Sequence, residues 1–224
     1  VMRHVHPEDV GRLQREIELA TSSVGVGRFA TEYRVIHPDG RLHWLLVHVR
    51  IVFLGEGDDR RAVVGYGTSQ DITPQKLVDE QLRLRSEELA RIVDMLPAAI
   101  WIADDSACTQ IRGNRYANDL LNVAPDTNVS QSVGSGSPVR LRQFSEGREL
   151  GPDDLPMQKA AATGEPQVDF ELHIERPDGG NVILLGGAVP LFDPGGSPRG
   201  AVAAFHDVTT RKRAEYELYR TVEE

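Results

Sequence analysis

The sequence predicts an α+β protein in which an antiparallel β meander occurs twice, with a long helix between the two copies. The first observation is an internal repeat, because two Pro-Asp-Gly turns lie 139 residues apart, counted from Asp39 to Asp178. The second is a pair of related triplets, Asp-Ile-Thr and Asp-Val-Thr, which lie 136 residues apart, counted from Asp71 to Asp207. The third is the alternation of apolar and polar residues before each turn, which is typical of a strand with one face in a core. A period this long indicates duplicated domains.

The length and composition of the chain agree with two globular domains. Its 224 residues suffice for two domains of about 100 residues each, and 40% of them are apolar. The formal charge of −9 argues against a nucleic-acid partner, and the lack of a long apolar run predicts no membrane span in this chain. The single cysteine, Cys108, excludes an intrachain disulfide and favours a cytoplasmic location.

The first copy is expected to be a helix followed by three strands. Residues 6–20 have apolar side chains at helical spacing, after a proline that suits the first turn. Residues 29–35 alternate as a strand, and the Pro-Asp-Gly turn that follows forms a hairpin, because proline presets φ and glycine accepts a positive φ. Two further strands are expected at residues 42–53 and 62–69.

The helix between the copies is expected to cover residues 74–96 and to form a coiled coil. Its seam positions are separated by alternating steps of four and three residues, the spacing of a heptad seam. They are Val78, Leu82, Arg85, Leu89, Ile92 and Leu96. This pattern predicts a parallel homodimer. Arg85 is either a device that sets the register or an exposed arginine on an imperfect seam.

The second copy has additional elements before its meander. Strands are expected at residues 99–103 and 109–112 and a helix at residues 114–121. Residues 126–145, rich in serine, glycine, asparagine and proline, are expected to be mostly loop. A short helix should start at Gly151 and stop near Gly164, before the three meander strands at about residues 168–174, 182–192 and 200–206.

The motifs of the second copy resemble those of a PAS domain over nearly its full length. These motifs are Trp101-Ile-Ala-Asp104, Gly113-Asn-Arg-Tyr-Ala-Asn-Asp-Leu-Leu121, the Pro-Asp-Gly hairpin and the closing Asp207-Val-Thr209. The first copy is similar only to the C-terminal half of such a domain, from Val5-His-Pro-Glu-Asp9 to Asp71-Ile-Thr73. The resemblance implies a five-stranded antiparallel sheet with helices on one face, a small pocket between them and a signalling role.

The resemblance also sets the expected domain boundaries. Residues 1–73 form an incomplete first PAS domain, 74–96 the linking helix, 97–209 a complete second domain and 210–224 the start of an output helix. The segment Arg211-Lys-Arg-Ala-Glu-Tyr-Glu-Leu218 is similar to the link from a PAS domain into a bacterial sensor histidine kinase, and diguanylate cyclases use similar links.

The sequence predicts neither a cofactor site nor a metal site. His4, His6, His43 and His48 lack the spacing of a zinc site. Haem is disfavoured, because the histidine nearest the ligand position of haem-binding PAS domains, His6, opens a helix beside a proline. Flavin is disfavoured, because Cys108 precedes a strand and lies outside the Asn-Cys-Arg-Phe-Leu-Gln motif of light-sensing relatives. No catalytic constellation is found, so an enzyme is the least favoured of the function classes.

The two triplets are the candidate functional residues. Asp71, Thr73, Asp207 and Thr209 stand where a strand ends and a helix begins, so they can cap the helix that follows. A cap of this kind can also be the mechanical joint between a sensor sheet and an output helix. The favoured function is a module that senses a ligand, a partner or an upstream domain and couples it to an output domain, most simply a histidine kinase. The alternative is a module that only dimerises its parent protein.

Overall fold

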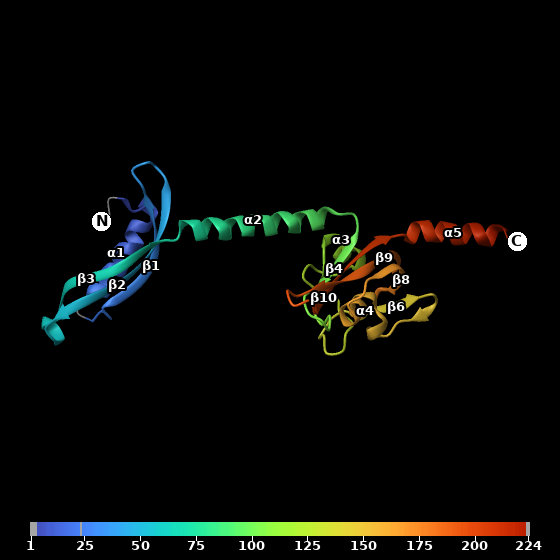
Figure 1. The fold of residues 1–224 in the computed structure, drawn as a ribbon. Helices are drawn as coiled ribbons and strands as arrows, with labels where there is room; N and C mark the ends of the chain where they lie inside the picture. The colour runs from blue at the N-terminus through green and yellow to red at the C-terminus, as the bar shows by residue number, and fades with distance from the viewer. Residues whose placement is uncertain (1–3, 23, 223–224) are drawn as a thin grey trace. The chain divides into compact units, whose positions relative to one another are not determined.

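The computed structural model describes residues 4–22 and 24–222 and divides the chain into two compact units, Val1–Glu87 and Glu88–Glu224 (Figure 1). Both are α+β, as the sequence predicts.

The first unit is a helix packed on a three-stranded antiparallel sheet. The helix α1 (Pro7–Thr21) precedes the strands β1 (Arg28–Ile36), β2 (Leu42–Leu54) and β3 (Arg61–Asp71), which pair in sequence order. A short 3-10 turn, η2 (Gly57–Asp59), connects β2 to β3. The small core consists of Val5, Leu13 and Tyr33, with partly buried apolar neighbours from α1, β1 and β2. The strand β3 is exposed along its whole length and lies at the edge of the sheet.

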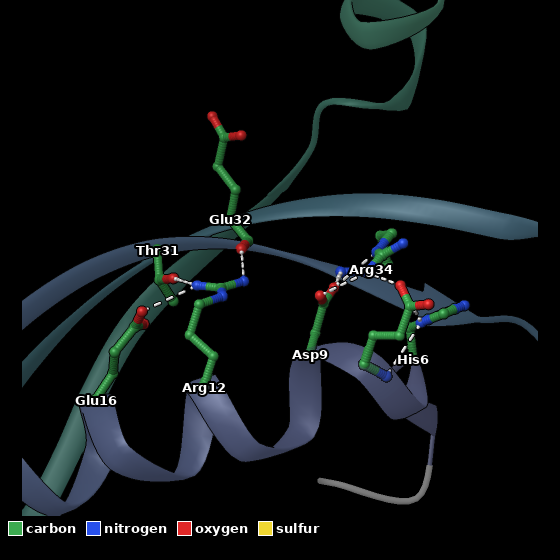
Figure 2. Close-up of polar contacts among 8 residues, drawn as sticks. His6, Asp9, Arg12, Glu16, Thr31, Glu32 and Arg34 are labelled. Atoms are coloured by element: carbon green, nitrogen blue, oxygen red, sulfur yellow. Dashed lines mark hydrogen bonds and ion pairs between the residues drawn. The ribbon is translucent and has the colours of Figure 1, made fainter.

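Polar contacts reinforce this small core by tying α1 to β1 (Figure 2). The buried Asp9 accepts hydrogen bonds from the backbone N, Nε and Nη2 of Arg34, at 2.8, 2.9 and 2.8 Å. The side-chain hydrogen bond from Arg34 is the main reason that the pKa of Asp9 falls to about 2. One turn further along, the Arg12 guanidinium donates to the Thr31 hydroxyl at 2.8 Å and to the Glu32 carbonyl at 2.6 Å.

The second unit has a larger sheet of seven strands in the order β5-β4-β10-β9-β8-β6-β7. Five of them form the expected sheet: β4 (Ala99–Ala103), β5 (Ile111–Gly113), β8 (Gln167–Glu175), β9 (Asn181–Phe192) and β10 (Pro198–Asp207). The strands β8, β9 and β10 are the counterparts of β1, β2 and β3, since they carry the equivalent repeat positions. The two sheets differ beside the third meander strand. The strand β3 is the last strand of its sheet, whereas its counterpart β10 pairs with β4, in which Trp101 lies opposite Ala203.

The expectation that residues 126–145 are mostly loop is confirmed for residues 126–141, whereas the last four form a strand that the sequence analysis did not predict. The short strands β6 (Arg142–Ser145) and β7 (Arg148–Glu149) form a hairpin that adds to the edge of β8. Arg142 stabilises this pairing through ion pairs with Glu149 at 2.9 Å and Glu175 at 2.8 Å. Glu175 is distant in sequence, so local composition gave no sign of it.

The helices of the second unit differ from expectation mainly at their ends. Asn114 is the N-cap of α3 (Arg115–Leu121), and its side chain accepts a hydrogen bond from the Ala117 N–H. The segment after Gly151 is a 3-10 turn, η3 (Pro152–Asp154), followed by α4 (Pro156–Thr163), which ends at Gly164 with a positive φ. The core lies between these helices and one face of the sheet, with Trp101, Leu184 and Phe205 among its largest members.

Two further helices follow the meanders. The helix α2 (Thr73–Met95) follows β3, and α5 (Thr209–Val222) follows β10. The expected seam residue Leu96 lies beyond the end of α2, so the assignment of residues 74–96 to one helix is wrong at that position. A proline follows at position 97, and the residue before a proline is disfavoured in helical conformation. Within the described residues, no helix combines the length and the apolar character that crossing a bilayer requires.

Candidate functional site: the strand–helix joints

The first joint is the turn from β3 into α2, and hydrogen bonds attach it to β2, the middle strand of the meander. The Asp71 carboxylate accepts a hydrogen bond from the Thr73 N–H at 2.8 Å. The Thr73 hydroxyl oxygen in turn accepts one from the backbone N–H of Trp44, in β2, also at 2.8 Å. The backbone N–H of Ile72 donates to the Trp44 carbonyl at 2.9 Å. The Asp71 side chain therefore caps α2, whereas the Thr73 hydroxyl, which the sequence predicts as a second cap, binds β2 instead. The backbone of the triplet also pairs with β2.

The second joint, from β10 into α5, repeats these contacts. Asp207 accepts from the Thr209 N–H at 2.8 Å, and the Thr209 hydroxyl accepts from the Ile183 N–H at 2.8 Å. The Val208 N–H donates to the Ile183 carbonyl at 2.9 Å. Ile183 occupies the repeat position of Trp44, because each lies five residues after the aspartate of its Pro-Asp-Gly turn. The structure thus brings together the predicted residues Asp207 and Thr209, as it does Asp71 and Thr73.

Each joint also contains an ion pair that the sequence reasoning missed. Lys76, in the first turn of α2, contacts Glu32 of β1 at 2.7 Å, and Lys212 of α5 contacts Glu171 of β8 at 2.8 Å. Each glutamate lies seven residues before its turn aspartate, and each lysine lies five residues after its triplet aspartate. Aligning the two repeats position by position would therefore have shown that this glutamate and this lysine recur in both copies.

The joints differ in the histidine that each contains. His43 Nδ1 lies 3.0 Å from Asp71, in the first joint, whereas His173 Nε2 lies 2.8 Å from Glu171, in the second. The pKa of Asp71 is lowered to about 2 by the side-chain hydrogen bond from Thr73 and then by that with His43. The pKa of Glu171 is lowered by its hydrogen bonds with His173 and Lys212. Both carboxylates are therefore ionised at neutral pH.

Cation–π contacts reinforce the first joint. The Lys76 ammonium lies 5.2 Å from the centre of a Trp44 ring, and the Arg34 guanidinium lies 5.6 Å from it. Both separations are within the range of cation–π attraction. Ile183 replaces the tryptophan in the second joint and offers no such surface.

The remaining seam residues lie along α2, where the structure buries none of the helix's described residues. Val78, Leu82, Leu89 and Ile92 are each at least half exposed, and Arg85 is exposed as well. The C-terminal end of α2 is held by the second unit, because the Asn114 side chain donates to the Val93 carbonyl at 2.8 Å. The Arg115 N–H also donates to the Asp94 carboxylate at 3.0 Å.

Other candidate residues have structural surroundings. Cys108 is fully buried at a φ of 48°, and burial raises its pKa to about 11, so its thiol is a poor nucleophile. His6 caps α1 by accepting from the Glu8 N–H, at 3.4 Å. Asp105 accepts from the N–H groups of Thr109 and Gln110, in the turn between β4 and β5. In the described part of the chain, no group of three or more acidic, histidine or cysteine residues has an arrangement that could hold a metal ion.

Comparison with known proteins identifies the family. Two family models, both described as PAS fold, match residues 1–66 and 148–213. The two-component sensor PprA of Pseudomonas aeruginosa is 26% identical over 218 residues, which are 96% of this chain and 22% of that protein. The uncharacterized protein y4lL of Sinorhizobium fredii is 25% identical over 224 residues, 95% of this chain and 24% of that protein. The chain thus spans less than a quarter of the length of these curated relatives.

The solved structures that match this chain include a PAS domain. The PAS domain of an HTR-like protein from Haloarcula marismortui is 18% identical, with a TM-score of 0.42, and covers 59% of this chain and 98% of that one. The two family matches fall on the two halves of the internal repeat. The chain therefore belongs to the PAS family and carries two PAS domains in tandem.

Proposed function

We propose that this chain is the sensory and coupling region of a larger signalling protein, in which movements of each PAS sheet pass through the joint into the helix that follows. The observation that carries this proposal is the repetition of the joint. A helix cap alone needs only the aspartate of the triplet. The first turn of α5 is additionally tied to β9 through Ile183 and to β8 through Glu171, so it is connected to all three strands of the meander.

The output is proposed to be a histidine kinase of a two-component phosphorelay. The support is the similarity to the two-component sensor PprA and the likeness of residues 211–218 to the link that precedes such kinases. A diguanylate cyclase is the alternative output. The chain itself is proposed to have no catalytic role and to act in the cytoplasm.

Dimerisation through α2 completes the proposal. The exposed apolar seam from Val78 to Ile92 would be buried by a parallel second copy, which removes apolar surface from water. A module that only dimerises its parent is the competing function. The joints favour coupling, because dimerisation through α2 would not require an equivalent joint at α5.

Hydrogen exchange of the full chain tests the joint. Asp207→Ala and Thr209→Val are each expected to speed exchange in the first turns of α5, at about residues 209–218, and to leave β8 to β10 protected. Losing one cap costs roughly 0.5–2 kcal/mol, a small part of the roughly 5–15 kcal/mol that stabilises a typical domain.

Asp193→Ala is the matched control. Asp193 accepts the Ser197 N–H at 2.9 Å in the turn between β9 and β10, a similar contact with no helix attached. This variant should leave α5 unchanged. Loss of protection across the strands in Asp207→Ala would mean that the aspartate is a core structural residue, and the coupling proposal would fail.

A further inference from the structure

Two histidines beside the hairpin turn between β1 and β2 lie on the same face of the first sheet. His43 of β2 pairs with Val35 of β1, and the His37 N–H donates to the Arg41 carbonyl at 2.8 Å. Residues 35, 37, 41 and 43 therefore share one face, because successive side chains of a strand point to opposite faces. The two imidazole rings are diagonal neighbours across the hairpin, and their centres lie 5.6 Å apart.

A carboxylate holds the Nδ1 atom of each ring. His37 Nδ1 lies 3.1 Å from Asp39, in the hairpin turn. His43 Nδ1 lies 3.0 Å from Asp71, at the first joint. Among the described residues, neither Nε2 atom has a hydrogen-bond partner. A neutral imidazole whose Nδ1 donates to a carboxylate keeps its lone pair on Nε2, which is the arrangement that histidine ligands of metal ions generally have.

The two carboxylates also favour a cation beside the rings. The pKa of Asp71 is lowered to about 2, first by the side-chain hydrogen bond from Thr73 and then by that with His43. The pKa of Asp39 is lowered mainly by its hydrogen bond from the Arg41 backbone N–H. Both carboxylates are therefore ionised at neutral pH. The Arg41 guanidinium, 3.7 Å from Asp39 and 81% exposed, offsets only part of this charge, so a divalent cation is attracted to the pair.

The hairpin and the joint do not themselves require the two histidines. Arg176 and Val182 occupy the equivalent positions of the second copy, 139 residues further along the chain. That copy nevertheless forms the same turn, in which the Gly180 N–H donates to Asp178 at 2.8 Å, and an equivalent joint. The histidine pair is thus an addition that the first unit alone carries at these positions, which points to a separate role.

The separation of the two rings fits a shared metal ion. A zinc-bound imidazole nitrogen lies about 2.0–2.1 Å from the ion, so two rings that share one ion at a tetrahedral angle have centres roughly 5 Å apart. The observed 5.6 Å is close to this value. Imidazole nitrogen suits Zn²⁺, Cu²⁺ and Ni²⁺, whereas Mg²⁺ prefers oxygen. Because the described residues contain no metal-binding group of three or more such side chains, water would complete the coordination and binding would be weaker than at a structural zinc site.

We propose that His37 and His43 bind one divalent transition-metal ion, such as Zn²⁺, through their Nε2 atoms. The positive charge of an ion on His43 Nε2 strengthens the Nδ1–H donor that faces Asp71. Since Asp71 also accepts the Thr73 N–H, the ion acts on the residue that caps α2. For this consequence the inference rests on the proposed coupling function, and it makes the first PAS domain responsive to a metal ion.

Nitrogen-15 nuclear magnetic resonance of the histidine rings in the full chain, titrated with Zn²⁺ and separately with Mg²⁺, tests the site. The chain has seven histidines, so His37→Gln and His43→Gln assign the signals. Zn²⁺ should shift the Nε2 signals of both residues along one saturation curve, and Mg²⁺ should leave them unchanged. Each of the two variants should weaken Zn²⁺ binding at least tenfold. His48→Gln is the matched control, because His48 lies on the opposite face of β2 and should not alter the affinity.

Hydrogen exchange with and without Zn²⁺ tests the link to the joint. At a concentration that saturates only the parent chain, Zn²⁺ should slow exchange at about residues 73–78 in that chain and not in His37→Gln. The proposal is overturned if Zn²⁺ gives no saturable shift of the two ring signals, if His43→Gln binds Zn²⁺ as tightly as the parent chain, or if bound Zn²⁺ leaves exchange in α2 unchanged. None of these results bears on Asp207→Ala at the second joint, so failure of the metal site and failure of the coupling function are distinguishable.

Discussion

Replacing Asp9 by asparagine is expected to destabilise the first unit in a pH-dependent way. Asp9 is 7% exposed, and the side-chain hydrogen bond from Arg34 is the main cause that lowers its pKa from 3.8 to about 2. One pKa unit corresponds to about 1.4 kcal/mol, so the ionised carboxylate contributes about 2 kcal/mol at neutral pH. Because the folded-state pKa is the lower one, this contribution is complete above about pH 4 and is lost as the pH falls toward 2.

The assay uses the one tryptophan that each unit contains. Urea unfolding of a Trp101→Phe background, followed by Trp44 fluorescence, reports the first unit alone. Glu8→Gln is the matched control, because Glu8 contacts the same Arg34 at 2.9 Å but is exposed, and such pairs contribute about 0–1 kcal/mol. Equal losses for Asp9→Asn and Glu8→Gln at pH 7, or an Asp9→Asn loss that is the same at pH 7 and pH 2, would refute the reasoning.

Three further predictions concern the rest of the chain. The isolated chain is expected to be a dimer by light scattering, and a monomer at high micromolar concentration would contradict this. Leu89→Asp should weaken the dimer by placing a charge in the seam, whereas Leu84→Asp, on another face of α2, should not. Cys108 should react with a thiol reagent only on unfolding, because burial raises its pKa to about 11; rapid labelling of the folded chain would show that the thiol is accessible. Lys212→Met should speed hydrogen exchange in the first turn of α5 at pH 7 and have little effect at a pH low enough to protonate Glu171. The pKa of Glu171 is lowered in the folded chain, so the ion pair contributes fully above the usual pKa of a glutamate and is lost as the pH falls below it. An effect that does not depend on pH would assign it to packing of the lysine side chain.

The sequence predicts those parts of the fold that depend on local signals. The meanders, their Pro-Asp-Gly turns and the caps at Asp71 and Asp207 follow from residues close to one another in the chain. The hairpin of β6 and β7 was missed, because its pairing depends on β8 and on an ion pair between Arg142 and the distant Glu175. The sequence also could not predict that the buried indole N–H of Trp101 has no hydrogen-bond partner among the described residues. The alternation of apolar and polar residues places the ring in the core but does not show whether an acceptor faces it.

The helix α2 has one end in each unit, with Thr73 fixed on β2 and the Val93 carbonyl held by Asn114. Each residue of an α-helix advances about 1.5 Å along the helix axis and turns about 100° around it. Removing one residue between Thr73 and Val78 would therefore turn the start of the apolar seam by about 100° relative to β2 and shorten the path by only about 1.5 Å. Inserting seven residues, close to two full turns, would nearly restore the direction in which the seam faces. The number of residues between the joint and the seam thus sets the side of the helix on which a partner could bind.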